Sequence, residues 1–361
     1  MFEKKRGAQI NMPDYVLAFV IAAGVALLLT PGVMLLAKKT GALDAPDARK
    51  VHKKPIPRIG GLGIYLAFMA AMGAMLMNVT VEEEVLQEIA GLMVGGTLIV
   101  ALGLIDDYLN LPAKVKLAGQ IVAACVLVFG FDVRIDFVTD PFGDYLYLEF
   151  LAIPATIFWI VGLTNTVNLI DGLDGLAAGV STIAAITIFL VALQQGFGLV
   201  AVLTATLAGA AFGFLYYNFN PARIFMGDSG SMFLGYMLAG ISVIGAVKSA
   251  ATIALIVPIL ALGLPIMDTT FAIVRRYRGG VPIFKPDKGH LHHRLLDLGF
   301  TQRQAVLLMY VISGLLGFSA VALTEVSPQM SIAIVCTVVC VVLFGAKKIG
   351  IFHMNDSAHQ H

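Results

Sequence analysis

The sequence predicts an all-α, polytopic integral membrane protein on two observations. Hydrophobic residues make up 58% of the 361 residues and charged residues only 13%, whereas an ordinary soluble domain carries about 25% charged residues. The apolar residues also gather into about eleven stretches that are long enough to cross a bilayer as helices. We place these spans at 14–37, 59–79, 89–107, 114–131, 150–168, 176–194, 197–217, 231–248, 251–274, 304–323 and 329–346.

The first apolar stretch follows a short basic segment, as in a signal peptide, but it is too long and lacks a convincing cleavage site. We therefore expect it to be the first span. Residues 132–149, "DVRIDFVTDPFGDYLYLE", are too polar to span. Their alternation and the central Pro-Phe-Gly-Asp turn predict a small surface hairpin. No other segment is long enough for a soluble domain, so we expect residues 1–361 to form one membrane domain.

Lysine and arginine residues in short loops predict the orientation in the membrane. With a cytoplasmic C-terminus, the loops at 38–58, 108–116, 218–230 and 275–303 and the tail hold most of the 24 basic residues on the inner side. The N-terminus and the hairpin then lie outside. The same orientation brings the four motifs "IDDYLN", "NTVNLIDGLDG", "NFNPARIFMGDSGS" and "KPDKGHLHHRL" to the cytoplasmic face, where we expect a functional site.

Asp106 and Asp107 end the span at 89–107. A carboxylate in a membrane span costs a few kcal/mol, and it is disfavoured at the negative end of a helix dipole. Adjacent residues of a regular helix point about 100° apart, so the pair could reach a common cation only where the helix frays. The alternative interpretation is a polar pair that simply ends the helix.

Asp171 and Asp174 stand in "NLIDGLDGLAAG", each followed by a glycine that lets a ligand approach the backbone. Asn165 and Asn168 add amide groups suited to hydrogen bonds with a base or a sugar. The alternative for Asp174 is the N-cap of the next helix. The acidic spacing excludes an EF-hand.

Asp228 precedes the span at 231–248, and the N-terminus of a helix favours anions. We expect this carboxylate to stay ionised and available to a divalent cation. The string GDSG around it resembles a serine-protease motif, but no soluble protease domain surrounds it.

The loop before the tenth span carries His290, His292, His293 and Arg294 among further lysines and arginines. The spacing does not suit zinc, and a cationic loop indicates phosphate binding. A solvated basic loop is the alternative. The basic first loop gives a weaker phosphate signal, with topology-setting charge as its alternative, and we expect Asp268, inside the span at 251–274, to be structural.

Carboxylates beside basic residues suit Mg²⁺-assisted phosphoryl chemistry, since Mg²⁺ is held by one or two carboxylates and substrate phosphates. The net charge of +1 and the lack of a binding motif indicate no nucleic-acid partner.

The strings "RKVHKKPIPRIGG", "LIDDYLNL", "NTVNLIDGLDGLAAG", "NFNPARIFMGDSGS" and "KGHLHHRL" resemble the polyprenyl-phosphate N-acetylhexosamine-1-phosphate transferases. That family includes enzymes that start O-antigen, enterobacterial common antigen and wall teichoic acid synthesis, and the phospho-MurNAc-pentapeptide translocase. The resemblance implies a helical enzyme of the bacterial cytoplasmic membrane, usually dimeric and surrounded by membrane lipids. It implies transfer of a sugar-1-phosphate from a UDP-sugar to undecaprenyl phosphate, with release of UMP and with Mg²⁺, or alternatively Mn²⁺, as cofactor.

The resemblance also implies roles for residues. Asp106 and Asp107 match the catalytic aspartates, with Asp106 activating the lipid phosphate, and Asp228 matches the Mg²⁺ ligand. The nucleotide and sugar side is matched by Asn168, Asp171 and Asp174, to which we add Asn165. Phosphate binding is implied for Lys53, Lys54, Arg58, His290, His292, His293 and Arg294.

"HKKPIPRIGG" and "HLHHRLLDLG" are similar to the branch that uses UDP-GlcNAc, and the C-terminal motif is similar to the teichoic-acid-initiating enzymes. The alternative within the family is the phospho-MurNAc-pentapeptide transferase. The alternative from another class is an anionic-solute transporter, which the absence of an evident repeat disfavours. Direct attack by the lipid phosphate and a phospho-aspartyl intermediate both fit the sequence.

Overall fold

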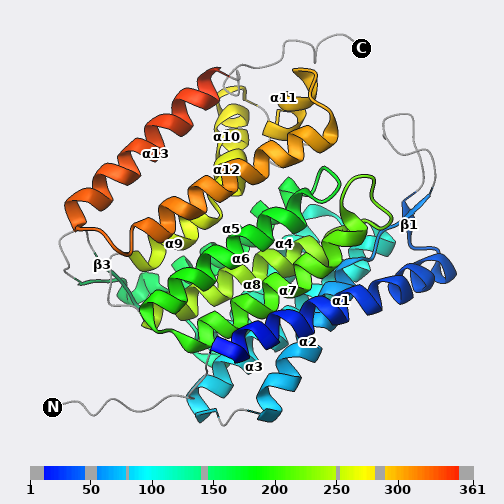
Figure 1. The fold of residues 1–361 in the computed structure, drawn as a ribbon, viewed down its shortest axis with the longest axis horizontal. Coiled ribbons are helices and arrows are strands. Elements are labelled where there is room, and N and C mark those ends of the chain that lie inside the picture. Colours follow the sequence, from blue (N-terminus) through cyan, green and yellow to red (C-terminus); the bar gives the residue numbers. More distant parts are fainter. Residues whose placement is uncertain are drawn as a thin grey trace.

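The structure is a computed structural model, and it describes residues 12–44, 55–78, 81–139, 145–248, 253–280 and 289–348. Helices dominate these residues (Figure 1). The longer helices are α1 (Met12–Thr40), α2 (Gly61–Asn78), α3 (Glu83–Leu109), α4 (Ala113–Cys125), α5 (Ala152–Ile170), α6 (Leu176–Gln195), α7 (Gly198–Asn218), α8 (Gly227–Lys248), α9 (Ile253–Ala261), α10 (Gly263–Arg278), α12 (Gln302–Ala322) and α13 (Pro328–Lys348). The short elements are β1 (Leu43–Asp44), β2 (Ile56–Pro57), η1 (Val126–Gly130), β3 (Phe137–Thr139), β4 (Tyr145–Tyr147), η2 (Glu149–Leu151) and α11 (Leu291–Asp297).

The length and apolarity of the helices confirm the predicted class. Within the described residues, eight helical segments are long and apolar enough to cross a membrane, and α2 and α13 each contain a shorter apolar helix. Many large apolar side chains on α1, α12 and α13 are exposed, as expected for helices that face lipid. The orientation in the membrane stays a prediction.

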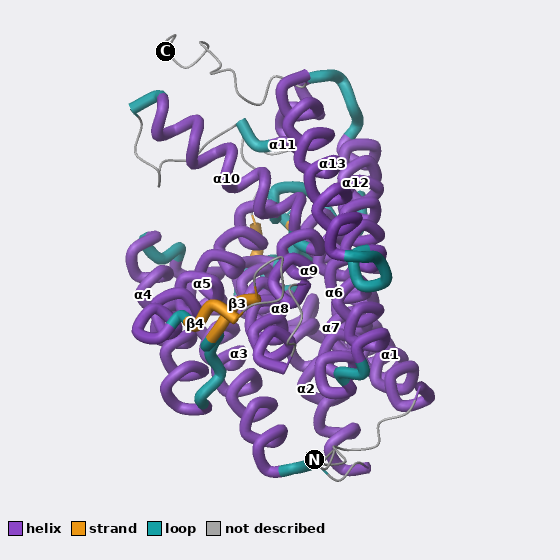
Figure 2. Tube along the Cα trace, turned by 90° about the vertical axis from the view of Figure 1, so that its left-hand side faces the viewer, coloured by secondary structure: helices purple, strands orange, loops and turns teal. Residues whose placement is uncertain are grey.

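The segment predicted as a single span at 251–274 is divided in the structure into two helices, α9 and α10. The break falls at Leu262, whose φ and ψ of −100° and 17° leave the helical region. Pro265 follows in the first turn of α10, where its missing N–H costs no helical hydrogen bond. Figure 2 shows α10 directed away from the main bundle, beside α11.

Two small antiparallel ribbons lie outside the helices. β3 and β4 pair with Phe137 opposite Tyr147, which confirms the strands of the predicted hairpin, while its turn lies outside the described residues. β1 and β2 pair with Leu43 opposite Pro57, a ribbon that the sequence analysis missed. The chain passes directly from β2 into Arg58, so the ribbon of β1 and β2 brings Arg58 towards the end of α3.

Helix α8 forms the centre of the bundle and packs against α2, α3, α5, α6, α7 and α9 (Figure 1). Small side chains allow these helices to approach closely. An added Cβ at Gly103 of α3 would overlap the backbone of Ser229, in the first turn of α8. This close crossing places the C-terminal end of α3, with its two aspartates, against the N-terminus of α8.

Candidate active site

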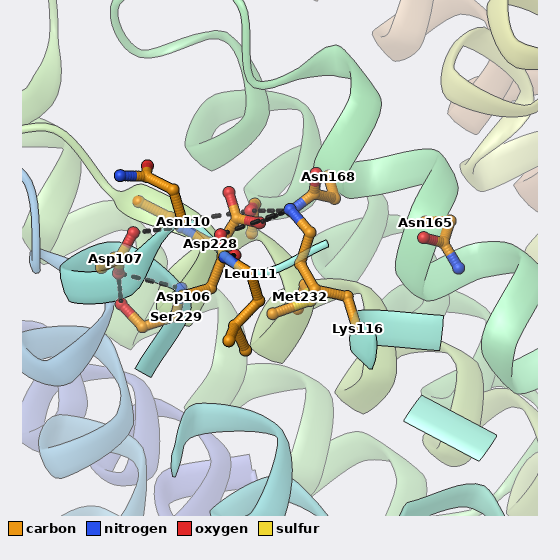
Figure 3. Close-up of polar contacts among 12 residues, drawn as sticks. Asp106, Asp107, Asn110, Leu111, Lys116, Asn165, Asn168, Asp228, Ser229 and Met232 are labelled. Atoms are coloured by element: carbon orange, nitrogen blue, oxygen red, sulfur yellow. Dashed lines mark hydrogen bonds and ion pairs between the residues drawn. The ribbon is translucent and has the colours of Figure 1, made fainter. Parts of the chain in front are cut away.

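Asp107, near the end of α3, holds the first turn of α8 (Figure 3). Its Oδ1 accepts the backbone N–H of Asp228 at 2.9 Å, and its Oδ2 accepts the backbone N–H and hydroxyl of Ser229 at 3.2 and 2.7 Å. These N–H groups have no partner within their own helix, and the helix dipole favours a carboxylate there. The contacts therefore give Asp107 a positioning role, and the catalytic role expected for it stays a prediction.

Lys116 of α4 lies between two carboxylates (Figure 3). Its Nζ donates to Oδ2 of Asp228 at 2.8 Å and to Oδ2 of Asp106 at 3.3 Å. The other oxygen of Asp106 accepts the backbone N–H of Leu111 at 2.7 Å. An ammonium group thus occupies the point at which the two carboxylates converge, and Asp228 lies in the first turn of α8 as predicted.

Asp106 and Asp107 point in different directions because α3 stays helical to Leu109. The fraying that would let both reach a common cation is not observed. Asp106 faces α4 and Asp107 faces α8, and both are almost fully buried, with exposures of 5% and 4%. Fixed partners for each carboxylate offset the cost of placing two charges at this helix end.

Arg58 contacts the same helix end from the loop after β2. Its Nε lies 3.9 Å from Oδ1 of Asp107, and its Nη2 donates to the side-chain oxygen of Asn110 at 3.2 Å. Arg58 therefore lies beside the two aspartates, and the phosphate binding expected of it stays a prediction. The other two predicted cations of this loop, Lys53 and Lys54, lie outside the described residues.

The two asparagines of α5 face different neighbours. Asn165 and Gln120 of α4 exchange hydrogen bonds between their amides at 2.6 and 3.3 Å. Asn168 donates to the hydroxyl of Ser231 of α8 at 3.0 Å. Both residues line the cavity described below, which is compatible with their predicted contact with a substrate.

The turn between α5 and α6 carries Asp171 and Asp174. The N-cap of α6 is Gly175, so the N-cap alternative for Asp174 is wrong. Instead, Oδ2 of Asp174 accepts the side-chain amide of Asn220 and the backbone N–H of Ala222, both at 3.0 Å. Burial raises the pKa of Asp171 to about 8, and the nearby carboxylates, with Asp228 first among them, add to the rise.

The predicted histidines gather at the start of α11. His290 and His292 are buried, with exposures of 5% and 2%. Nδ1 of His290 lies 2.9 Å from Oδ2 of Asp268 on α10. Burial lowers the pKa of His292 to about 4, helped by the neighbouring His293, so His292 is neutral at pH 7.

A cavity of about 840 Å³ is lined by some of these groups, but Arg58, Asp106, Asp107, Asp171 and Asp174 are not among its lining residues. Its polar lining includes Lys116, Asn168, Asp228, His290, His292 and His293. Its apolar lining comes from α4, α5 and α10 and includes Leu117, Phe158, Trp159, Leu163, Ile266 and Ile273. Arg294 lies on α11 and is not among the described lining residues. One cavity therefore offers a charged end and an apolar wall.

The described residues contain no group of three His, Cys, Asp or Glu side chains that could hold a metal ion by themselves. Asp106 and Asp228 nevertheless turn oxygens towards one ammonium group. This donor set suits an ion that takes most of its ligands from water and substrate, which is the habit of Mg²⁺.

Sequence reasoning missed Lys116 and Gln120. Lys116 follows Asp106 by ten residues and lies near the start of an apolar helix, where the dipole disfavours a cation. That misplaced charge was an available signal. The amide pair of Gln120 and Asn165 depends on the packing of α4 against α5 and left no comparable signal in the chain.

Comparison with known proteins gives a consistent result. The family profile described as Glycosyl transferase family 4 matches residues 89–246. A Bacillus subtilis protein named probable undecaprenyl-phosphate N-acetylglucosaminyl 1-phosphate transferase is 41% identical over 90% of the chain and 89% of its own length. Decaprenyl-phosphate N-acetylglucosaminephosphotransferase of Mycobacterium tuberculosis is 37% identical over 91% and 87% of the two chains. Undecaprenyl-phosphate alpha-N-acetylglucosaminyl 1-phosphate transferase of Escherichia coli is 27% identical over 78% and 76%.

Proposed function

The chain belongs to glycosyl transferase family 4, and we propose that it transfers N-acetylglucosamine 1-phosphate from UDP-GlcNAc to undecaprenyl phosphate. The reaction releases UMP and forms undecaprenyl-diphospho-GlcNAc. The same chemistry is named for relatives that use undecaprenyl or decaprenyl phosphate.

The observation that carries this proposal is the cavity with a charged end and an apolar wall. Lys116 and Asp228 belong to the charged and polar lining, which also includes His290, His292 and His293. Cationic and hydrogen-bonding groups there suit a diphosphate. The aromatic and aliphatic side chains of α5 and α10 suit a hydrocarbon chain, whose burial is favourable by the hydrophobic effect. A nucleotide sugar and a lipid phosphate can therefore meet in one place.

In the proposed reaction, an oxygen of the lipid phosphate attacks the β-phosphorus of UDP-GlcNAc. A new phosphorus–oxygen bond forms, the bond between the β-phosphorus and the bridging oxygen breaks, and UMP leaves with that oxygen. Lys116 holds the phosphates by charge, and Asp106 takes a proton from the lipid phosphate if one is present. Arg58, through Asp107, keeps the end of α3 in place.

Mg²⁺ fits this site as a cofactor, since Asp106 and Asp228 converge on a positive charge. Asp228 would hold the ion, with Asp106 beside it and the diphosphate completing the ligand set. When bound, the ion spreads the negative charge that develops on the transferred phosphate.

Removing divalent cations is expected to lower the rate of lipid-linked product formation at least about 100-fold. Excess Mg²⁺ restores the rate, and Mn²⁺ substitutes for it. The measurement is product formation in EDTA, with Mg²⁺-saturated EDTA as the control. A rate that persists in EDTA after dialysis would exclude the proposed cofactor.

The contacts of Asp106 favour direct attack over a phospho-aspartyl intermediate. One of its oxygens accepts Leu111 N–H, and the other accepts from Lys116, so a covalent bond to phosphorus would require one of these contacts to break. Without lipid acceptor, we expect no exchange of labelled UMP into UDP-GlcNAc. Exchange that requires the enzyme but not the lipid would establish the covalent route instead.

The function is tested with the purified protein, undecaprenyl phosphate and Mg²⁺, offered either UDP-GlcNAc or UDP-MurNAc-pentapeptide. The proposal predicts lipid-linked product and UMP with UDP-GlcNAc. Product only from the pentapeptide donor would retain the chemistry and move the chain to the other branch. A lack of UMP release with every donor would favour the transporter alternative.

The proposed setting is a bacterial cytoplasmic membrane with the cavity open to the cytoplasm. The basic loops around the site support it, because such loops stay on the cytoplasmic side. UDP-sugars are soluble, charged donors, which makes that side the accessible one. A homodimer, also proposed, is testable by light scattering of the protein in detergent.

A further inference from the structure

Asp268 of α10 is a buried carboxylate that the proposed reaction does not use. Its exposure is 2%, and both of its oxygens are engaged. Oδ2 lies 2.9 Å from Nδ1 of His290, and Oδ1 accepts the backbone N–H of Leu291 at 2.8 Å. One side chain thus holds both the ring of His290 and the first residue of α11.

These contacts determine which nitrogen of the His290 ring carries hydrogen. A carboxylate oxygen accepts hydrogen bonds, so the contact favours Nδ1–H as the donor. A carboxylate on one ring nitrogen fixes the tautomer and the orientation of the other nitrogen. His290 is a lining residue of the cavity, and Nε2 is the ring nitrogen that Asp268 leaves available to a ligand.

A second contact attaches the same segment to α10. Arg275 lies seven residues after Asp268, on the same face of a helix. An added Cβ at Gly289 would overlap the guanidinium group of Arg275. The segment at 289–291 is therefore packed along one face of α10, with Asp268 holding its ring and its backbone.

His292 connects His290 to the turn between α5 and α6. The rings of His290 and His292 are nearly parallel, 5.8 Å apart and inclined by 8°. An added Cβ at Gly172 would lie 2.6 Å from Nε2 of His292, so this ring rests directly on the turn that carries Asp171. Within the described part of the chain, the buried Nδ1 of His292 has no hydrogen-bond partner.

We propose that Asp268 is a positioning residue that sets the tautomer of His290 and fixes the histidine segment, residues 290–293, against the turn at 171–174. Asp268 thereby links α10 to the side of the cavity predicted to hold the nucleotide. The kinetic consequence of this arrangement rests on the proposed function, whereas the tautomer of His290 does not.

The variant Asp268→Asn tests the proposal with little change of shape. The amide oxygen still accepts Leu291 N–H, but the amide nitrogen donates to Nδ1 of His290 and moves the ring hydrogen to Nε2. We expect the ¹⁵N resonances of the His290 ring to report Nδ1–H in the parent protein and Nε2–H in the variant. An unchanged tautomer would overturn the proposal even if no transfer activity were measurable.

The kinetic test is a double-mutant cycle with His290→Ala. We expect Asp268→Asn to lower kcat about 10- to 100-fold, as for other groups that orient a histidine. In the His290→Ala background the same substitution should change kcat less than about twofold. Effects that multiply would show that Asp268 does not act through His290 and would overturn the proposal.

Thr301→Ala is the matched control, because Thr301, like Asp268, accepts a backbone N–H at the start of a helix. The Thr301 hydroxyl accepts Gln304 N–H at the start of α12, outside the cavity. This variant should lower the midpoint of thermal unfolding with no change in kcat. If the parent protein transfers no sugar phosphate, the proposed function fails, and the ¹⁵N spectrum still decides the role of Asp268.

Discussion

Replacing Asp228 by asparagine is expected to lower the rate of sugar-1-phosphate transfer by about 10³-fold while the fold is retained. The carboxylate lies 2.8 Å from Nζ of Lys116 at the charged end of the cavity. Asparagine keeps the shape but carries no charge to hold a cation. The first turn of α8 should remain in place, because Asp107 binds the backbone N–H of residue 228 rather than its side chain.

The measurement is product formation under saturating donor and acceptor, with thermal unfolding recorded for each variant. Asp132→Asn is the matched control. Asp132 pairs with Arg134 at 3.2 Å on the exposed hairpin segment, and its side chain is 79% exposed. The variant Asp132→Asn should therefore retain the parent rate. If Asp228→Asn keeps more than a tenth of the parent rate, Asp228 has no central place in the reaction.

Replacing Lys116 by methionine is expected to lower the rate at least about 100-fold. The substitution removes the cation between Asp106 and Asp228 and leaves two carboxylates directed at one point. Two carboxylates directed at one point repel each other. Asp106 and Asp228 should therefore move apart, or one of them should take up a proton. Both changes remove the charge pattern that receives a diphosphate. Lys116→Arg restores the charge in a larger group, and we expect an intermediate rate.

Lys114→Met is the matched control for this second variant. Lys114 lies two residues earlier on the same helix and is exposed to solvent. Loss of its charge should leave the rate within about twofold of the parent, as for an exposed surface substitution. Equal losses in Lys114→Met and Lys116→Met would assign the effect to the overall charge of the helix rather than to the bridging position.

Much of the fold could be predicted because a membrane simplifies the pattern. Long apolar stretches must form helices there, since every backbone group needs an internal partner. The break between α9 and α10 could not be predicted with equal ease. Pro265 marks the place, but prolines are tolerated in the first turn of a helix and within membrane helices. The sequence alone did not distinguish a kinked helix from two separate ones.

The sequence predicted the types of residue at the candidate site, but not which contacts each of them makes. Asp106 and Asp107 are equivalent as a sequence pair, yet one faces α4 and the other caps α8. The difference arises from the close crossing of α3 and α8 at Gly103, which is a property of packing. Asp174 is engaged by the loop before α8 rather than by its own helix, for the same reason.

Some contacts were only partly indicated by the sequence. Asp268 was expected to be structural, and the structure gives it a specific partner in His290, 22 residues away. Lys116 was counted as one basic loop residue among many. Its place near the N-terminus of an apolar helix, the end that repels cations, was the observation that could have distinguished it from the others.

The most direct test of the account uses UDP-GlcNAc labelled with ³²P in the β-phosphate and ¹⁴C in the sugar. The purified protein is incubated with this donor, undecaprenyl phosphate and Mg²⁺, and the lipid product and released nucleotide are separated. Transfer of the sugar phosphate as a unit predicts both labels in the lipid at the donor ratio, with unlabelled UMP released. A lipid that carries ¹⁴C without ³²P, with labelled UDP released, would contradict it.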